Sequence, residues 1–142
     1  KIVEATEVKI IASDISLQAI SFAQENAAFA GVDHIIEFQT CDFAETEIPE
    51  RPRGVIMFNP EYGERLGEND ELEVTYKRMG DFMKQKCAGY RGYIFTGNLE
   101  LAKKVGLKAS RRIEFWNGTI DCHLLKYELF EGTREPRKGS EQ

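Results

Sequence analysis

Asn59, Pro60 and Tyr62 have types and spacing that suit chemistry on the amino group of a planar base. A proline after Asn59 keeps that asparagine extended and the loop stiff, so the Asn59 side-chain oxygen and the Pro60 carbonyl can both accept hydrogen bonds. Two such acceptors can bind both hydrogens of an exocyclic amine and direct its nitrogen lone pair toward an electrophile. Tyr62 can stack on the base, which contributes about 1–3 kcal/mol per base in single-stranded recognition. The pattern therefore indicates alkyl transfer to a base that is unpaired or flipped out of its helix.

Two aspartates follow the first two predicted strands. Asp14 comes after the apolar run VKIIA, and Asp42 comes after HIIEF. Ligands of parallel α/β sheets bind at the carboxyl ends of the strands, so we expect both acids on one rim with Asn59 and with the segment 96–98 after the fourth strand. There Asp14 can accept both hydroxyls of a ribose. Each acid also has a local alternative, since Asp14 can share a helix cap with Ser16 and Asp42 can lie in a solvated turn.

Strands and helices alternate along the chain. Four apolar runs predict strands at 8–12, 34–38, 54–58 and 92–96, of which 8–12 is apolar enough to be covered on both faces. A helix follows the Ser16 cap and stops at Gly31, and a short helix follows the Asn98 cap and stops before Gly106. Between them, a helix stripe is formed by Leu72, Tyr76, Met79, Met83 and Cys87.

The last ordered part of the sequence changes pattern. An Asn117-Gly118 pair separates two β-rich runs at 110–116 and 119–130, which is a strong hairpin signal. The alternation followed by one hairpin predicts an α/β fold with a mostly parallel, doubly wound sheet that ends in an antiparallel element.

Composition limits the functions that the chain can have. The 142 residues, 42% of them hydrophobic, are enough for one globular domain. A net charge of -5 gives no electrostatic sign of nucleic acid, so any such affinity needs a local patch or another domain. Three widely spaced cysteines predict reduced thiols and a cytoplasmic protein, and with only two histidines, His34 and His123, a metal site is not expected. No apolar run reaches membrane length.

The segments IIASDIS, CDFAE and FNPEYGERLG together resemble known enzymes. They are similar to the Rossmann-like class I methyltransferases that use S-adenosyl-L-methionine to modify exocyclic amines. Among these, the chain most resembles the bacterial ribosomal RNA large-subunit guanine-N2 methyltransferases, whose signature is Asn-Pro-Pro-Tyr-Gly-Glu-Arg-Leu. The likeness extends from about position 8 to position 130 and includes the late hairpin.

This resemblance implies a cofactor, a substrate and a role for each site residue. The cofactor is S-adenosyl-L-methionine, and the partner is ribosomal RNA. The residues implied in cofactor binding are Asp14 for the ribose, Asp42 and Phe43 for the adenine, and also Ile15 and Asn59. The residues implied in catalysis at the guanine are Asn59, Pro60 and Tyr62, and those implied in substrate binding are Tyr62 and Arg65. Arg65 has an equal alternative as a solvated neighbour of Glu64.

The chain departs from the family pattern in two ways. Glu61 stands where the family has its second proline, which places a negative charge beside the transfer site. The family's first strand and glycine-rich cofactor loop do not occur before Asp14. We therefore expect residues 1–130 to be the C-terminal portion of a catalytic domain and 131–142 to be a disordered polar tail. Such a fragment is expected to be inactive alone and to pair with its missing N-terminal segment or with itself.

Two other functions remain open at this point. Adenine-N6 methylation of DNA uses a similar tetrapeptide, and a truncated sheet can serve as a non-catalytic scaffold. Phe115 and Trp116 are expected to pack and not to stack on RNA. The one basic cluster is expected to be a solvated face; it consists of Lys103, Lys104, Lys108, Arg111 and Arg112.

Overall fold

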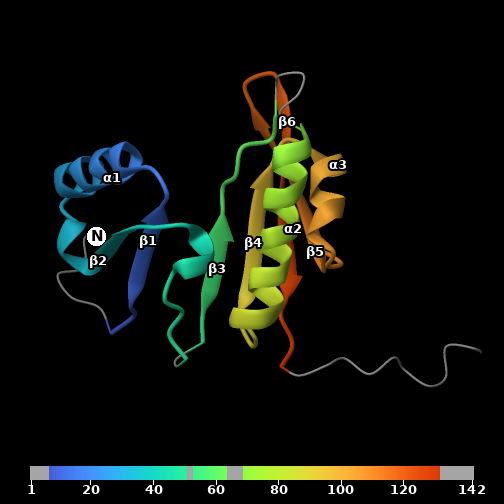
Figure 1. Ribbon diagram of the computed structural model, residues 1–142. Coiled ribbons are helices and arrows are strands. Elements are labelled where there is room, and N and C mark those ends of the chain that lie inside the picture. Colours follow the sequence, from blue (N-terminus) through green and yellow to red (C-terminus); the bar gives the residue numbers. More distant parts are fainter. Residues whose placement is uncertain (1–6, 51–52, 64–68, 132–142) are drawn as a thin grey trace, which may run out of the picture. The chain divides into compact units, whose positions relative to one another are not determined.

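The computed structural model describes residues 7–50, 53–63 and 69–131, and the chain divides into two compact units. Unit 1 comprises residues 1–52 and unit 2 residues 53–142, and Figure 1 labels the helices and strands of both. Among the predicted features, Arg65 and the tail beyond Glu131 lie outside the described residues. The prediction that residues 1–130 form part of one catalytic domain stays a prediction.

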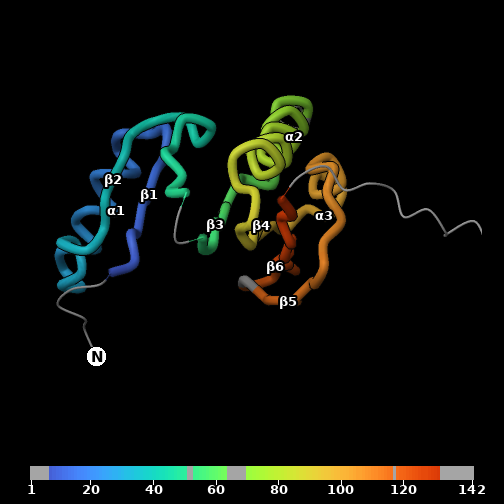
Figure 2. The backbone as a smooth tube through the Cα atoms, turned by 90° about the horizontal axis from the view of Figure 1, so that it is seen from below, coloured from blue at the N-terminus to red at the C-terminus, as the bar shows by residue number. Residues whose placement is uncertain are grey.

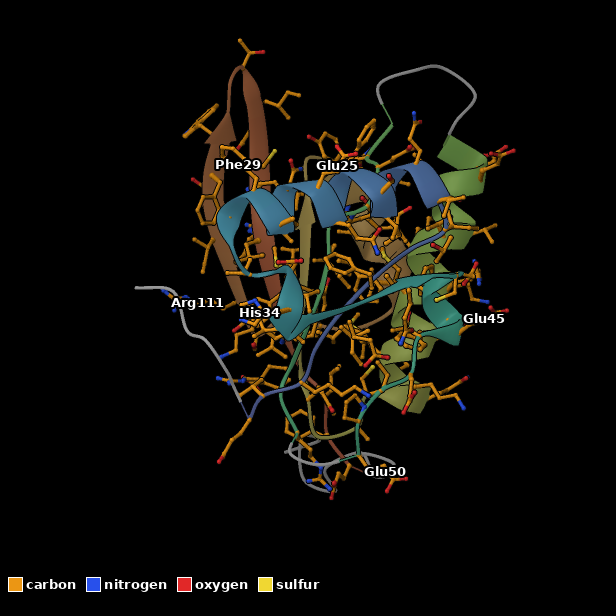
Figure 3. The ribbon with its side chains drawn as sticks, turned by 90° about the vertical axis from the view of Figure 1, so that its left-hand side faces the viewer. Glu25, Phe29, His34, Glu45, Glu50 and Arg111 are labelled. Carbon is orange, nitrogen blue, oxygen red and sulfur yellow. The ribbon has the colours of Figure 1, made fainter. Side chains whose placement is uncertain are left out.

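Unit 1 is a β-α-β element. It contains strand β1 (Ile10–Asp14), helix α1 (Leu17–Ala30), the 3-10 turn η1 (Asp33–Ile35), strand β2 (Ile36–Thr40) and the 3-10 turn η2 (Phe43–Glu45). The two strands pair in parallel, in a register that runs from Ile10 opposite Ile36 to Asp14 opposite Thr40. Figure 3 faces this unit, with Glu25 and Phe29 marking α1.

The ends of α1 lie where the sequence predicts them. The Ser16 hydroxyl accepts a hydrogen bond from the Ala19 N–H at 3.2 Å, and Gly31 closes the helix in the left-handed conformation with φ 75°. Ile20 and Ala27 are buried. Short-range capping signals therefore fix both ends of this helix.

Strand β1 begins and ends two residues later than its apolar run. The ladder includes Asp14, whose carbonyl accepts a bond from the Cys41 N–H at 3.0 Å, because backbone pairing does not require an apolar side chain. Val8 is 61% exposed and Ile10 is 40% exposed. The expectation of a strand covered on both faces is wrong for the described residues, since unit 1 supplies one described α-helix to pack on it.

Unit 2 is a four-stranded mixed sheet with helices on one face (Figure 2). Its elements are β3 (Val55–Phe58), α2 (Asn69–Lys86), β4 (Arg91–Thr96), α3 (Leu99–Ala102), the 3-10 turn η3 (Lys103–Val105), β5 (Arg111–Asn117) and β6 (Ile120–Glu128). The strand order is β3-β4-β6-β5. β3 and β4 are parallel, whereas β6 is antiparallel to both of its neighbours, as predicted for a parallel sheet that ends in a hairpin.

The core of unit 2 lies between α2 and the sheet. All five residues of the predicted α2 stripe are buried, and so are Ile94 and Thr96 of β4. Gly80 lets α2 approach η3 closely, since a Cβ atom there would lie 1.8 Å from the Val105 carbonyl oxygen. This contact sets the position of α2, which carries Tyr76 one turn earlier.

The hairpin differs from its prediction by one residue. Asn117 pairs with Ile120, so the turn consists of Gly118 and Thr119, and Gly118 has φ 65°. The glycine of the predicted pair therefore supplies the left-handed conformation that the turn needs, while Asn117 ends the strand.

Candidate active site

The loop 59–63 begins where β3 ends. β3 pairs with β4 up to Phe58 opposite Ile94, and the next residue but one is Pro60, which has no N–H to continue a ladder. Asn59 is exposed, whereas Pro60 and Tyr62 are half-buried. Among residues 7–50, 53–63 and 69–131, none forms a hydrogen bond with the Asn59 side chain.

Two hydroxyl groups, linked to each other by a hydrogen bond, anchor this loop. The Tyr76 hydroxyl donates to the backbone carbonyl of Glu61 at 3.0 Å and lies 2.7 Å from the Thr96 hydroxyl. The Thr96 hydroxyl in turn accepts a bond from the Asn98 N–H at 3.1 Å. Tyr76 and Thr96 are both 0% exposed. The loop is therefore tied to α2 and to the end of β4.

Asn98 ties the same loop a second time. Its side-chain amide donates to the carbonyl of Tyr62 at 3.1 Å, and its side-chain oxygen accepts from the Leu101 N–H at 3.0 Å. The residue that caps α3 thus also fixes the backbone of the predicted base-stacking residue.

The Tyr62 ring lies against the backbone of Gly97. A Cβ atom at Gly97 would lie 2.9 Å from the Tyr62 ring and 3.1 Å from Ile120 at the hairpin. Gly97 therefore provides the room in which this ring lies, and any larger residue at that position would displace it.

Burial raises the pKa of two tyrosines of unit 2, which are protonated at neutral pH even at their ordinary pKa. Burial raises the pKa of Tyr76, and the hydrogen bond with Thr96 offsets this only in part. Burial also raises the pKa of Tyr127, to about 12. At neutral pH the Tyr76 hydroxyl is therefore a hydrogen-bond donor, as its bond to Glu61 requires.

In unit 1, the predicted cofactor residues lie at or just after the carboxyl ends of two paired strands. Asp14 is exposed, and its Oδ1 accepts a bond from the Ser16 N–H at 2.8 Å. Asp42 is half-buried, and its Oδ1 accepts from the Ala44 N–H at 2.9 Å. The local roles predicted as alternatives are thus present. Of the neighbouring apolar residues, Ile15 is 74% exposed and Phe43 is half-buried.

Each unit thus brings part of the predicted site together. Asp14 ends β1, and Asp42 lies two residues after the end of the neighbouring strand β2. In unit 2, Asn59, Pro60 and Tyr62 share one loop, which hydrogen bonds connect to Tyr76 and Asn98. The single rim joining all of them stays a prediction. Tyr76 was missed as a site residue, although a hydroxyl within an otherwise apolar helix stripe was a signal that could have identified it.

The aromatic residues of the hairpin behave differently from each other. Phe115 packs edge-on against Phe95, with ring centroids 6.0 Å apart. Trp116 is 73% exposed, so the expected packing is wrong for this residue, which lies at the outer end of β5 beside the turn.

Two lysines of the basic cluster predicted from the sequence form ion pairs. Lys103 lies 2.9 Å from Glu100, and Lys104 lies 3.6 Å from Glu73. These exposed pairs fit the predicted solvated face.

Other site types find no support in the described part of the chain. Across 7–50, 53–63 and 69–131, no three His, Cys, Asp or Glu residues are grouped so that they could hold a metal ion. Within the same ranges, no helix combines the length and apolarity that a membrane crossing requires. All three cysteines are free thiols.

The sheet topology of the two units, with acids after β1 and β2 and an Asn-Pro-x-Tyr loop after β3, defines a methyltransferase-like α/β fold. A family model bears this out over residues 1–126, and the chain belongs to that family, the RMKL-like methyltransferase domain (UPF0020).

Known proteins are similar over most of this chain. A curated relative, the "Ribosomal RNA large subunit methyltransferase K/L" of Syntrophotalea carbinolica, is 37% identical over 125 residues, which cover 86% of this chain and 18% of the relative. This chain therefore spans less than a fifth of that protein.

Solved structures show the same fold. A predicted N6-adenine-specific DNA methylase from Listeria monocytogenes is 28% identical with a TM-score of 0.71, and the match covers 84% of this chain and 30% of that one. An RNA methyltransferase from Salinibacter ruber, solved in complex with S-adenosyl-L-homocysteine, is 14% identical with a TM-score of 0.60. That match covers 89% of this chain and 69% of the Salinibacter chain. The second likeness concerns the fold alone.

Proposed function

We propose that this chain carries catalytic-site residues of an S-adenosyl-L-methionine-dependent methyltransferase that modifies the exocyclic N2 amine of a guanine in ribosomal RNA. The observation that carries the proposal is the Asn59-Pro60-x-Tyr62 loop. Asn59 is exposed, and the carbonyls of Glu61 and Tyr62 accept hydrogen bonds from Tyr76 and Asn98. Family membership and the name of the K/L relative support methylation of ribosomal RNA.

The residues of unit 1 fit the ribose and adenine of the cofactor. The bond from the Ser16 N–H orients the Asp14 carboxylate, and its other oxygen has no partner among the described residues. That oxygen can accept a ribose hydroxyl, while Ile15 and Phe43 offer apolar surface to a purine. When bound, S-adenosyl-L-methionine supplies an electrophilic methyl group on its sulfonium.

The residues of unit 2 act on the target amine. The Asn59 side-chain oxygen and the Pro60 carbonyl accept the two amine hydrogens and orient the nitrogen lone pair. Tyr62 stacks on the guanine, which must leave its helix to reach the loop. The amine needs no strong general base, since its proton is lost readily once the nitrogen carries the methyl group and a positive charge.

Glu61 is compatible with this arrangement. Its side chain is exposed, and its contribution to the hydrogen-bonded loop is a backbone carbonyl, which proline at the same position would also offer. We propose that the Arg65 side chain contacts RNA phosphate, a role that lies outside the described residues.

Replacing Asn59 tests the proposal. In the full-length protein, Asn59→Ala is expected to lower methyl transfer by about two orders of magnitude, because it removes an aligning hydrogen bond of the transition state. Cofactor affinity, measured by calorimetry, is expected to change little. Asn26→Ala, which removes an exposed asparagine side chain from α1, is the matched control. Equal turnover of the Asn59 variant and the wild-type protein would refute the assignment.

Adenine-N6 methylation is the second candidate, and the name of the Listeria structure favours it. Digestion of the methylated product to nucleosides, followed by mass spectrometry, distinguishes N2-methylguanosine from N6-methyladenosine. RNA and DNA substrates should be compared with the same enzyme. A protein that binds no cofactor and methylates neither substrate would instead match the scaffold alternative.

A further inference from the structure

We infer that Tyr76 and Thr96 are positioning residues for the Asn59–Tyr62 loop, acting through a directional chain of hydrogen bonds that ends on the Glu61 carbonyl. The inference rests on the proposed function for its catalytic consequence. It goes beyond that function because neither residue is placed in contact with base or cofactor.

The direction of the chain follows from the supply of protons. A tyrosine hydroxyl has one hydrogen, and the Tyr76 hydroxyl donates it to the Glu61 carbonyl. Thr96 must therefore donate to Tyr76 across the 2.7 Å contact. The Thr96 oxygen then accepts from the Asn98 N–H. Each hydroxyl accepts one bond and donates one, so the bonds polarise one another in the same sense.

Burial makes these hydrogen bonds hard for water to replace. Tyr76 and Thr96 are both 0% exposed, so water cannot readily take over a bond that is lost. The two hydroxyls come from residues 20 positions apart, one on α2 and one at the carboxyl end of β4. The position of the loop thus depends on the packing of α2 against the sheet.

Two consecutive carbonyls of the loop are held in this way. Tyr76 binds the Glu61 carbonyl, and the Asn98 side chain binds the Tyr62 carbonyl. Both contacts are to backbone, so they place the loop whatever side chain stands at position 61. The residues on either side of Glu61, the acceptor Pro60 and the stacking Tyr62, are placed as a result.

Loss of a single hydroxyl is expected to loosen the loop while the fold persists. Tyr76→Phe and Thr96→Val are nearly isosteric substitutions that interrupt the chain of hydrogen bonds at different points, whereas Thr96→Ser keeps a hydroxyl. A misplacement of the base by a fraction of an ångström to about 1 Å is enough to reduce kcat by about 10- to 100-fold. The affinity for S-adenosyl-L-methionine should stay within about threefold of wild type, since the proposed ribose contact comes from Asp14.

The experiment compares these variants with Tyr127→Phe in the full-length protein. Tyr127 is also buried in unit 2, so its variant controls for loss of a tyrosine hydroxyl from the same core. Cleavage by chymotrypsin after Tyr62, followed by mass spectrometry, should accelerate in Tyr76→Phe and Thr96→Val, because a loosened loop enters the protease more readily. It should stay at the wild-type rate in Tyr127→Phe and near it in Thr96→Ser, and kcat should follow the same order.

The outcomes separate this inference from the proposed function. If the wild-type protein methylates neither RNA nor DNA, the proposed function fails, while the cleavage rates still decide whether Tyr76 and Thr96 position the loop. Unchanged cleavage after Tyr62 in both hydroxyl-free variants would overturn the inference even if the enzyme is an active methyltransferase. A parallel loss of cofactor affinity in all variants, Tyr127→Phe included, would also overturn it, since that marks general damage to the fold.

Discussion

Gly80 offers a sharp test of how unit 2 is packed. An alanine at this position places its Cβ atom 1.8 Å from the Val105 carbonyl oxygen and 2.7 Å from the Val105 carbonyl carbon. Cβ contacts under 3.0 Å essentially do not occur, so α2 and η3 must move apart until the first distance rises from 1.8 Å to at least 3.0 Å. Both contacting groups are backbone, so no side-chain rotation relieves the clash.

The expected cost follows from two opposing terms. Alanine is about 1 kcal/mol better than glycine in a helix interior. Overpacking of a core costs about 1–3 kcal/mol and sometimes more, and a backbone clash belongs at the upper end of that range. The expected net loss is about 2 kcal/mol or more, because the displacement also disturbs the buried neighbours Met79 and Met83.

Two other glycines provide graded controls. At Gly92 an added Cβ meets the flexible Met83 sulfur at 2.6 Å, and at Gly54 it meets Tyr90 at an ordinary 3.9 Å. Thermal unfolding of the three full-length variants should therefore show a large loss for Gly80→Ala, a small one for Gly92→Ala and little change for Gly54→Ala. If Gly80→Ala unfolds at or above the wild-type temperature, the close contact between α2 and η3 is wrong.

Two further predictions concern the cofactor residues and the cysteines. Asp14→Ala should weaken S-adenosyl-L-methionine binding, measured by calorimetry, at least tenfold more than Asn59→Ala does, since a hydrogen bond to a charged acceptor contributes about 1.5–3 kcal/mol. Asp33→Ala in η1 is the control, and equal affinities of the Asp14 and Asn59 variants would contradict the ribose role. Burial raises the pKa of Cys87 to about 11, so its reactive thiolate is scarce at pH 8 and becomes abundant only as the pH approaches that value. Peptide mapping after brief iodoacetamide treatment at pH 8 should therefore find half-buried Cys41 alkylated well before Cys87, and equal labelling of the folded protein would count against the described core.

Local signals in the sequence were enough to place several elements. The Ser16 cap and the Gly31 stop set the ends of α1, and Asn98 and Gly106 set those of the short helical segment from α3 to η3, because each depends on hydrogen bonds within a few residues. The α2 stripe was equally predictable, since one repeating pattern of apolar residues describes a single buried face. The Asn-Pro-x-Tyr motif likewise indicated its chemistry through residue type and order.

The tertiary structure alone decided how that motif is held. Tyr76 fits the apolar stripe by its position, and nothing local shows that its hydroxyl meets Thr96, 20 residues away, and the Glu61 carbonyl, 15 residues away. The same limit applies to Gly80, whose contact with Val105 joins two separate helical segments. It applies also to Trp116, whose exposure depends on what packs beside the hairpin. Sequence patterns record each residue's own preference, whereas a hydrogen bond or close backbone contact between distant residues exists only once both segments have packed.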